Sequence, residues 1–233
     1  MQLIEAAERL FYVNGYENTS VQDVLDEIHF SKGGFYHHFD SKLSLLHAIC
    51  ETRAQETCEA AAELLSHTEG TSLEKLNQVL HASAIWQGGG PGFVSLLIGV
   101  AYREDGALMR ERMKECQLSG MQDLVVEILS EGRKAGELWA SDLEGTAQLI
   151  LRLYTQFTDE VAFLLAREES REALAEKLVR KLTLYRDAIE RILIAPIGSI
   201  ILFEADELLE QSRQIVEDRL RREAGLVQMR IDL

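Results

Sequence analysis

Only two prolines, Pro91 and Pro196, interrupt the 233 residues of this chain. Because proline removes a backbone donor and clashes with the preceding turn of an α-helix, its scarcity leaves room for long helices. Hydrophobic residues make up 46% of the chain and charged residues 27%, a composition typical of a protein with a buried core rather than a disordered one. We therefore expect an all-α protein.

The charge of the chain limits how it can bind nucleic acid. Its formal net charge is -15, from 24 Lys and Arg against 39 Asp and Glu. So acidic a chain does not coat nucleic acid or an anionic membrane, and any DNA binding must be local. The chain has no apolar run long enough to span a bilayer, and its start lacks the pattern of a signal peptide. With three cysteines, an odd number, the sequence favours a cytoplasmic protein without a membrane partner.

Three short helices are predicted at the N-terminus. Residues 3–13 repeat apolar side chains at the i, i+3, i+4, i+7 spacing of one helix face. A second helix is expected over residues 21–28, opened by Ser20 with Asp23 three residues later in the pattern of a capping box. After a turn at residues 29–31, a third helix follows within about four residues.

Longer helices are predicted for the rest of the chain. Capping boxes at Thr71–Glu74 and Ser141–Glu144 mark two of the starts. Residues 197–203 favour β-structure locally, but they are isolated and are expected to form a connector. The amphipathic pattern predicts long helices over about residues 41–66, 72–86, 93–102, 108–134, 142–166, 170–195 and 204–223.

The second and third helices have the spacing of a helix-turn-helix, in which the later helix enters the DNA major groove. Phe35 and Phe39 lie four residues apart and supply its inward anchor. Its remaining surface carries hydrogen-bond donors suited to DNA, namely Lys32, Tyr36, His37 and His38. A merely solvated polar face is the alternative interpretation of these four residues.

Two glycines stand at the start of the third helix. Gly33 and Gly34 lower helix stability by about 1 kcal/mol each relative to Ala, yet they allow the backbone to approach phosphates closely. This combination favours a contact function for that turn. A metal site from His37, His38 and Asp40 is disfavoured, because adjacent side chains on a helix point about 100° apart. We expect no metal and no cofactor.

Several spaced groups of residues coincide in this region: Ile4, Ala6, Ala7, Leu10 and Phe11, then Gly15–Tyr16, Thr19–Val21, Ser31–Phe39 and Ser41–Lys42. In this combination the chain resembles the TetR family of transcriptional regulators over roughly residues 2–49. The resemblance implies a homodimer whose N-terminal domains occupy successive major grooves of a palindromic, double-stranded DNA operator. It also implies a variable helical domain that binds a small-molecule effector, with the helix from Ser41 as the linker.

The resemblance further implies roles for individual positions. Lys32, Gly34 and His37 would face bases or nearby phosphates. Contacts mainly to the DNA backbone are implied for Thr19, Gln22, Tyr36, His38 and Lys42. Ser31 and Gly33 complete the expected DNA-binding set.

Two positions depart from the family pattern. His29 stands where the turn commonly has glycine, and Leu25 stands where the second helix commonly has alanine. Both changes affect how the two helices cross. Residues 1–47 also carry 3 Lys or Arg against 7 Asp or Glu, a net charge of -4. We therefore expect weak non-specific DNA binding with a modest dependence on salt.

The sequence divides into residues 1–47 as the DNA-binding domain, 48–195 as the effector-binding and dimerisation domain, and 196–233 as a connector and C-terminal amphipathic helix. Bulky and adaptable side chains on the middle helices are candidates to line an apolar effector pocket. For each of these side chains taken singly, a place in the core or the dimer interface is favoured over a ligand contact. They are Trp86, Phe93, Tyr102, Met109, Met113, Met121, Tyr154 and Phe157.

The function predicted from these observations is a dimeric, sequence-specific DNA-binding regulator, expected to be a repressor that a small molecule of unknown identity releases from its operator. The alternative is a helical protein-interaction scaffold whose DNA reader is non-functional. An enzyme is not expected, because no nucleophile, metal-ligand or phosphate-loop motif occurs in the sequence. Cys50 and Cys58 are expected to be small buried hydrophobes rather than a redox switch.

Overall fold

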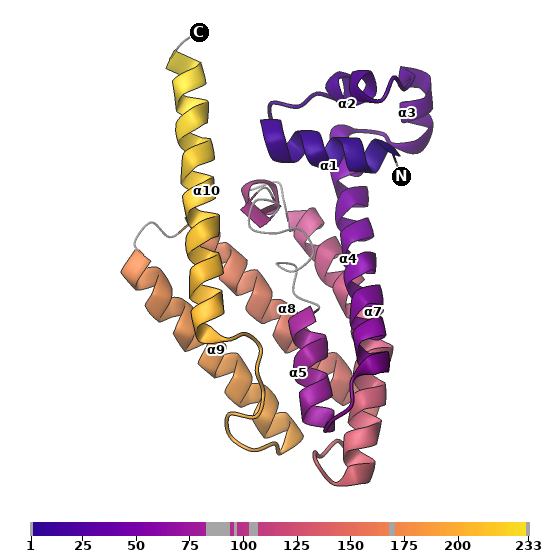
Figure 1. Ribbon diagram of the computed structural model, residues 1–233, viewed down its shortest axis with the longest axis vertical. Helices are drawn as coiled ribbons and strands as arrows, with labels where there is room; N and C mark the ends of the chain where they lie inside the picture. The colour runs from indigo at the N-terminus through magenta and orange to yellow at the C-terminus, as the bar shows by residue number, and fades with distance from the viewer. Residues whose placement is uncertain (1, 83–93, 96, 103–106, 168–170, 232–233) are drawn as a thin grey trace.

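The computed structural model of the protein describes residues 2–82, 94–95, 97–102, 107–167 and 171–231. No strand occurs within these ranges, and the predicted all-α class is confirmed. In chain order the labelled helices of Figure 1 are α1 (Gln2–Asn14), α2 (Val21–Glu27), α3 (Lys32–His38), α4 (Lys42–His67), α5 (Ser72–Ala82), α7 (Ala107–Ala135), α8 (Leu143–Arg167), α9 (Arg171–Leu193) and α10 (Ala205–Ile231).

Helices α1, α2 and α3 form a small group at one end of the molecule, which we call the reader domain (Figure 1). Phe11, Leu25 and Phe35, one from each helix, are buried in its core. The capping box predicted at Ser20 is confirmed, because its hydroxyl accepts the Asp23 N–H at 3.1 Å and the Asp23 carboxylate accepts the Ser20 N–H at 2.7 Å. These two bonds set the first turn of α2.

The turn between α2 and α3 is closed by a residue in the left-handed conformation. His29 has a φ of 54°, and its N–H donates to the Asp26 carbonyl while the next N–H, that of Phe30, donates to the Leu25 carbonyl. This is the Schellman pattern, in which glycine is the usual residue because a side chain there costs about 1 kcal/mol. Ser31 then starts α3 by accepting the Gly34 N–H at 3.0 Å.

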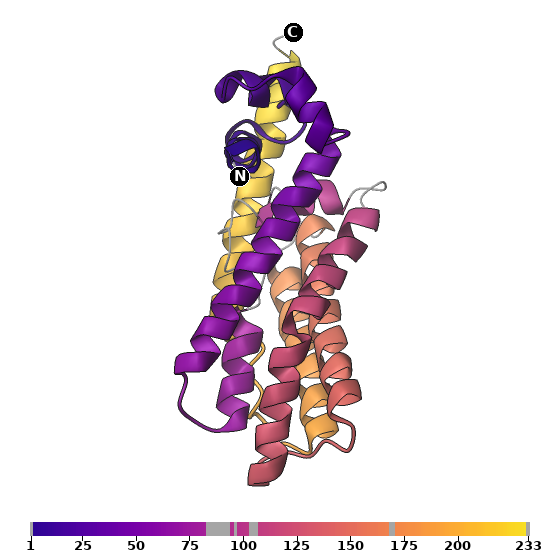
Figure 2. The same cartoon turned by 90° about the vertical axis from the view of Figure 1, so that its right-hand side faces the viewer.

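Helix α4 connects the reader domain to the rest of the molecule. It is 26 residues long and begins at a second capping box, formed by Ser41 and Ser44. Its first turns belong to the reader core through Leu45 and Leu46, and Arg53 binds Glu8 of α1 at 2.7 Å. Figure 2 shows α4 running from the reader domain down the length of the molecule.

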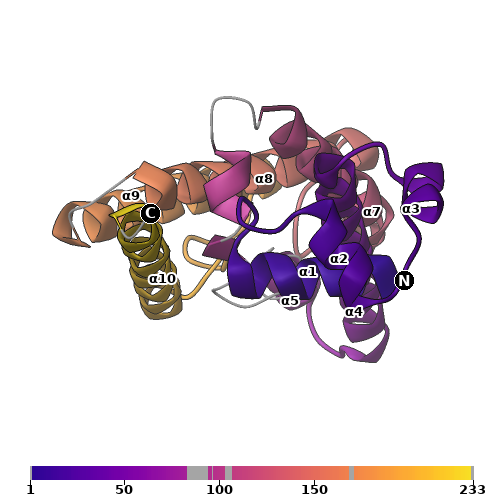
Figure 3. The same ribbon diagram turned by 90° about the horizontal axis from the view of Figure 1, so that it is seen from above.

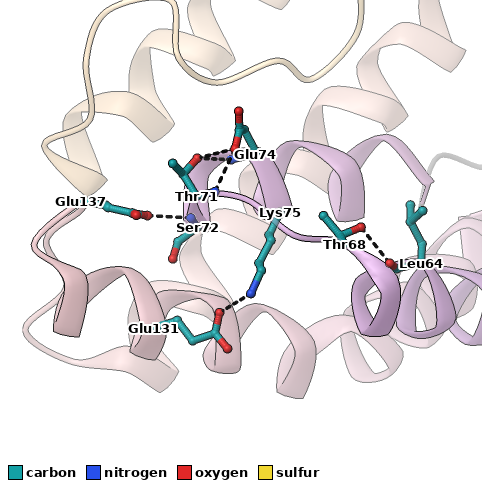
Figure 4. Close-up of polar contacts among 8 residues, drawn as sticks. All are labelled: Leu64, Thr68, Thr71, Ser72, Glu74, Lys75, Glu131 and Glu137. Carbon is teal, nitrogen blue, oxygen red and sulfur yellow. Dashed lines mark hydrogen bonds and ion pairs between the residues drawn. The ribbon is translucent and has the colours of Figure 1, made fainter.

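The far end of α4 is fixed by α5 and α7 (Figure 4). The predicted capping box Thr71–Glu74 is present, with the Glu74 carboxylate accepting the Thr71 N–H at 2.8 Å. The Ser72 N–H donates to Glu137 at 2.6 Å, and Lys75 binds Glu131 at 2.6 Å. Since these contacts join the start of α5 to the end of α7, they hold the α4–α5 turn against the larger helical group.

Helices α5 and α7–α10 share the larger core with α4. Its fully buried large side chains include Met121, Tyr154 and Phe157. The connector predicted after Pro196 contains no strand and is held by side chains instead. Asn77 bonds the backbone of residues 199 and 201, and the buried Glu190 accepts the Ile200 N–H at 3.2 Å.

The start of α8 corrects one detail of the sequence prediction. The capping box was expected at Ser141, but the capping residue is Asp142, whose carboxylate accepts the Gly145 N–H at 3.1 Å. The Asp142 carbonyl also accepts the first intrahelical bond, from Thr146 at 2.9 Å. Aspartate caps helices as well as serine does, and Gly145 lets this carboxylate approach, because a Cβ there would lie 2.3 Å from Asp142 Oδ2.

Candidate DNA interface and effector-sensing domain

The predicted recognition helix α3 lies at the outer edge of the reader domain (Figure 3). Phe35 faces inward and is fully buried, and its ring lies 5.7 Å from that of Phe39. This anchor turns the opposite face of α3 to solvent, and Tyr36 is 51% exposed. The other exposed side chains of this face are Ser31, Lys32, His37 and His38.

The two glycines of α3 have different surroundings. A Cβ at Gly33 would have nothing within 4 Å, so this position is open to an approaching molecule. A Cβ at Gly34 would lie 2.8 Å from the Phe30 ring and 3.1 Å from the Ser31 hydroxyl. Packing within the chain therefore requires a glycine at position 34. No neighbour among the described residues requires a glycine at position 33.

Thr19 does not lie where a DNA contact requires it. Its side chain is 0% exposed, and its hydroxyl donates to the carbonyls of Gly15 at 2.9 Å and Leu10 at 3.3 Å. We therefore correct its expected DNA-backbone contact to a structural role that ties the α1–α2 loop to α1. The neighbouring Ser20 is exposed, and its hydroxyl is engaged in the capping box of α2.

Two further predicted contacts already have partners within the chain. Gln22 is exposed, and its amide donates to Asp26 at 2.7 Å. The Lys42 ammonium donates to the Tyr16 carbonyl at 2.7 Å and lies 4.2 Å from the centre of the Tyr16 ring. Partial burial lowers the pKa of Lys42, and the Glu17 carboxylate opposes this shift. Lys42 thus joins the start of α4 to the α1–α2 loop.

The reader domain presents little positive charge to DNA. Arg9 forms an ion pair with Glu27, which joins α1 to α2. In the part of the chain that the structure describes, Lys32 has no ion-pair partner, and it lies on the exposed face of α3. The balance of local charge is therefore consistent with the net -4 counted from the sequence.

The predicted effector residues lie mostly in the core. Met121, Tyr154 and Phe157 are fully buried in the same apolar core, and Tyr102 is partly buried against it. Trp86 and Phe93 lie outside the described residues, as do the side chains of Met109 and Met113. The structure thus brings together four of the predicted residues, contributed by α7, α8 and the segment that ends at Tyr102.

Residues 97–102, which we call the bridging segment, contact both cores. Leu97 and Ala101 are buried in the reader core, whereas Ile98 is buried in the larger core. Figure 1 shows this region beneath α1, between the reader domain and the larger helical group. Adjacent positions on a helix point about 100° apart, so a single turn can serve two neighbours. The sequence gives no signal of this, because both faces are simply apolar.

A polar cluster surrounds the end of the bridging segment. The Tyr102 hydroxyl donates to the Asp159 carboxylate at 2.6 Å, and the same carboxylate binds Lys114 at 2.9 Å. Arg110 donates to the Ala101 carbonyl and lies 5.3 Å from the centre of the Tyr102 ring. Burial raises the pKa of Tyr102, and the bond to Asp159 raises it further, so the phenol remains a donor.

The environment of the buried Cys50 thiol favours a packing role over chemical reactivity. Burial raises the pKa of the Cys50 thiol to about 12, which disfavours the reactive thiolate. Within the described ranges no group of three or more His, Cys, Asp or Glu side chains is placed to hold a metal ion. Among the described residues, no helix is long and apolar enough to cross a membrane.

Comparison with known proteins identifies the reader domain. The model of the bacterial regulatory proteins of the tetR family matches residues 3–49. An uncharacterized HTH-type transcriptional regulator of Lactococcus lactis subsp. lactis is 39% identical over 54 residues, which cover 23% of this chain and 28% of that protein. The HTH-type regulator YuxN of Bacillus subtilis, also uncharacterized, is 27% identical over 158 residues, which cover 64% of this chain and 52% of that protein. The matches thus span about half or less of these relatives.

The larger helical group has the same fold as solved regulators. A TetR-family regulator of Pectobacterium atrosepticum superposes with a TM-score of 0.59 at 22% identity, covering 83% of this chain and 93% of that one. At this identity the likeness shows the fold alone. Residues 3–49 thus form a DNA-binding domain of the tetR family of bacterial regulatory proteins, and the chain shares the fold of a TetR-family transcriptional regulator.

Proposed function

We propose that this regulator acts in the cytoplasm as a homodimeric repressor, which binds a palindromic operator and is released from it by a small-molecule effector. The observation that carries the proposal is the geometry of α3. Its inward anchor Phe35 leaves Lys32, Tyr36 and His37 together on an exposed face at the edge of the molecule. Such a face can enter a major groove, with base contacts specifying sequence and phosphate contacts fixing register.

Release requires that the effector bind one arrangement of the two domains better than the other. The bridging segment supports this coupling, since Leu97 and Ala101 pack in the reader core while Tyr102 bonds to α8. Helix α4 is joined to the reader domain by the Arg53–Glu8 ion pair, and the turn after its far end is held by the contacts of α5. An effector that moves the middle helices would tilt α4 and change the separation of the two recognition helices from the half-site spacing of about 34–36 Å.

The test is selection of bound duplexes from a randomised DNA pool at about 0.1 M salt, where weak electrostatic binding is already reduced. We expect a palindrome with two equal half-sites. Lys32→Ala should then relax the base preference, whereas Tyr36→Phe should weaken binding similarly on all sequences. Failure to enrich any sequence with a folded dimer would contradict the proposal and favour the protein-interaction scaffold.

A further inference from the structure

The polar cluster of Tyr102, Arg110, Lys114 and Asp159 carries more positive than negative charge. Arg110 and Lys114 are both cations. Within the described residues, Lys114 binds the carboxylate of Asp159 at 2.9 Å, whereas Arg110 lies over the Tyr102 ring and donates to the Ala101 carbonyl. The next carboxylate on α8, Glu160, is bound by Lys181 at 2.6 Å. Although burial opposes the shift, this bond and the others to Glu160 lower its pKa, so it stays engaged with its own cation.

The cluster adjoins the apolar core of the larger helical group. Phe157 and Tyr154 lie on α8 within two turns of Asp159 and are fully buried. Tyr102 packs against the same core with its ring and reaches Asp159 with its hydroxyl. Ligand sites of proteins typically combine an apolar lining with a few placed polar groups. This combination suits an amphipathic molecule whose chain enters the core and whose head stays at the cluster.

Asp159 is placed as an exchangeable anion. Its side chain is 20% exposed, and that of Lys114 is 26% exposed, so the pair is neither dry nor fully solvated. An incoming anion can form an ion pair with the Lys114 ammonium, while the displaced Asp159 carboxylate becomes hydrated. Such an exchange leaves no buried cation without a partner, which is the costly outcome at partly buried ion pairs.

We propose that Arg110 and Lys114 bind the negatively charged head of an amphipathic effector, and that Asp159 is the group this head displaces. The proposal rests on the regulator function proposed above and names the chemical class of its effector. Displacement of Asp159 also breaks its bond to Tyr102 at the end of the bridging segment. Head-group binding is thereby linked to the segment that packs in the reader core.

Isothermal titration calorimetry of the full chain without DNA tests which head-group charge the protein prefers. The probes are decanoate, decanol and decyltrimethylammonium, which share one alkyl chain and differ in the charge of the head. We expect decanoate to bind at least about tenfold more tightly than the other two, the effect of one charged hydrogen-bonded contact. Equal binding of decanoate and decanol, preference for the cation, or no binding of any probe would each overturn the proposal.

Three variants test whether Lys114 and Asp159 are responsible for the preference for an anionic head group. Lys114→Gln should weaken decanoate binding about tenfold and leave decanol unchanged, whereas Asp159→Asn should strengthen decanoate binding because it removes the competing charge. Lys181→Gln is the matched control, since it breaks a neighbouring ion pair of similar exposure, in which the adjacent carboxylate of α8, Glu160, binds a lysine of α9. Each variant is checked for an unchanged helical circular dichroism signal. Unchanged or weaker decanoate binding by Asp159→Asn refutes the displacement even if Lys114→Gln fails to fold.

The titration and the DNA selection have independent outcomes, so the anionic effector and the regulator function can be rejected separately. A palindrome recovered in the DNA selection, together with no decanoate preference, would retain the regulator and reject the anionic effector. Decanoate binding that responds to Lys114→Gln and Asp159→Asn but not to Lys181→Gln, together with no selected DNA, would retain the anionic site and reject the regulator. When both succeed, decanoate should lower operator affinity in the native chain and fail to do so in Lys114→Gln.

Discussion

At the residue scale, the recognition helix contains two adjacent glycines, and the surroundings of the two differ. Gly34 faces Phe30 and the capping hydroxyl of Ser31, so the chain itself accounts for the missing side chain. Gly33 faces open space and keeps a conformation that other residues also adopt. Since glycine costs about 1 kcal/mol relative to alanine in a helix, Gly33 lowers stability without any packing benefit. This agrees with the proposed approach of this backbone to DNA.

Substitution of each glycine separates stability from binding. Gly33→Ala should raise the free energy of unfolding by about 0.5–1 kcal/mol and weaken operator binding about tenfold by blocking backbone approach. Gly34→Ala should gain less stability, because the Phe30 ring has to move. Urea unfolding and fluorescence anisotropy with the selected operator measure the two effects. Operator affinity unchanged by Gly33→Ala would show that this backbone does not approach DNA.

His29 is a second residue whose role is decided by backbone conformation. Because its φ is 54°, His29→Gly should stabilise the chain by about 0.5–1 kcal/mol by removing left-handed strain. His29→Ala removes the same imidazole but keeps the strain, and it serves as the control. The two free energies of unfolding in urea should therefore differ, and equal values would mean that the strain is relieved elsewhere.

At the element scale, capping side chains set the starts of helices α2, α3, α4, α5 and α8. Helices α2, α3 and α4 begin where the sequence pattern places them, after the capping residues Ser20, Ser31 and Ser41. Helix α8 begins one residue later than its pattern indicates, because Asp142 competes with Ser141 and a glycine follows at the position its carboxylate contacts. Two adjacent capping residues make a start ambiguous in sequence, and the neighbouring side chain resolves it.

The two candidate capping residues of α8 predict different losses in the free energy of unfolding. Asp142→Ala should lower the free energy of unfolding by about 1 kcal/mol, the usual cost of removing a capping side chain. Ser141→Ala is the matched change one residue earlier and should cost less than about 0.5 kcal/mol, as expected for an exposed site. Thermal or urea unfolding of both variants decides the matter, and the reverse order would restore Ser141 as the cap.

At the scale of the whole molecule, apolar side chains remain exposed on the two long helices α8 and α9. Leu149 and Phe163 on α8 are 55% and 44% exposed, and Leu184 on α9 is 61% exposed. Large apolar side chains gathered on a surface commonly mark an interface. They agree with the homodimer proposed above, whose two copies would pair through these helices and so set the distance between the recognition helices.

A charge placed on this surface should separate the two copies. Leu184→Glu should weaken dimerisation about 30-fold or more, since a buried interface residue contributes about 2 kcal/mol and an unpaired charge costs further. Operator affinity should fall with it. Leu64→Glu on α4, 41% exposed, is the control and should remain dimeric. Analytical ultracentrifugation measures both, and a dimeric Leu184→Glu would move the interface away from α9.

The all-α class, the helix-turn-helix and the exposed face of α3 could be predicted from sequence, because capping residues and helical periodicity act over a few neighbouring positions. The burial of Thr19 could not, since its partners Leu10 and Gly15 become neighbours only when α1 and its loop fold together. The bond between Tyr102 and Asp159 joins residues far apart in the chain. Sequence periodicity tells which face of a helix is apolar, but only tertiary packing decides which partner that face meets.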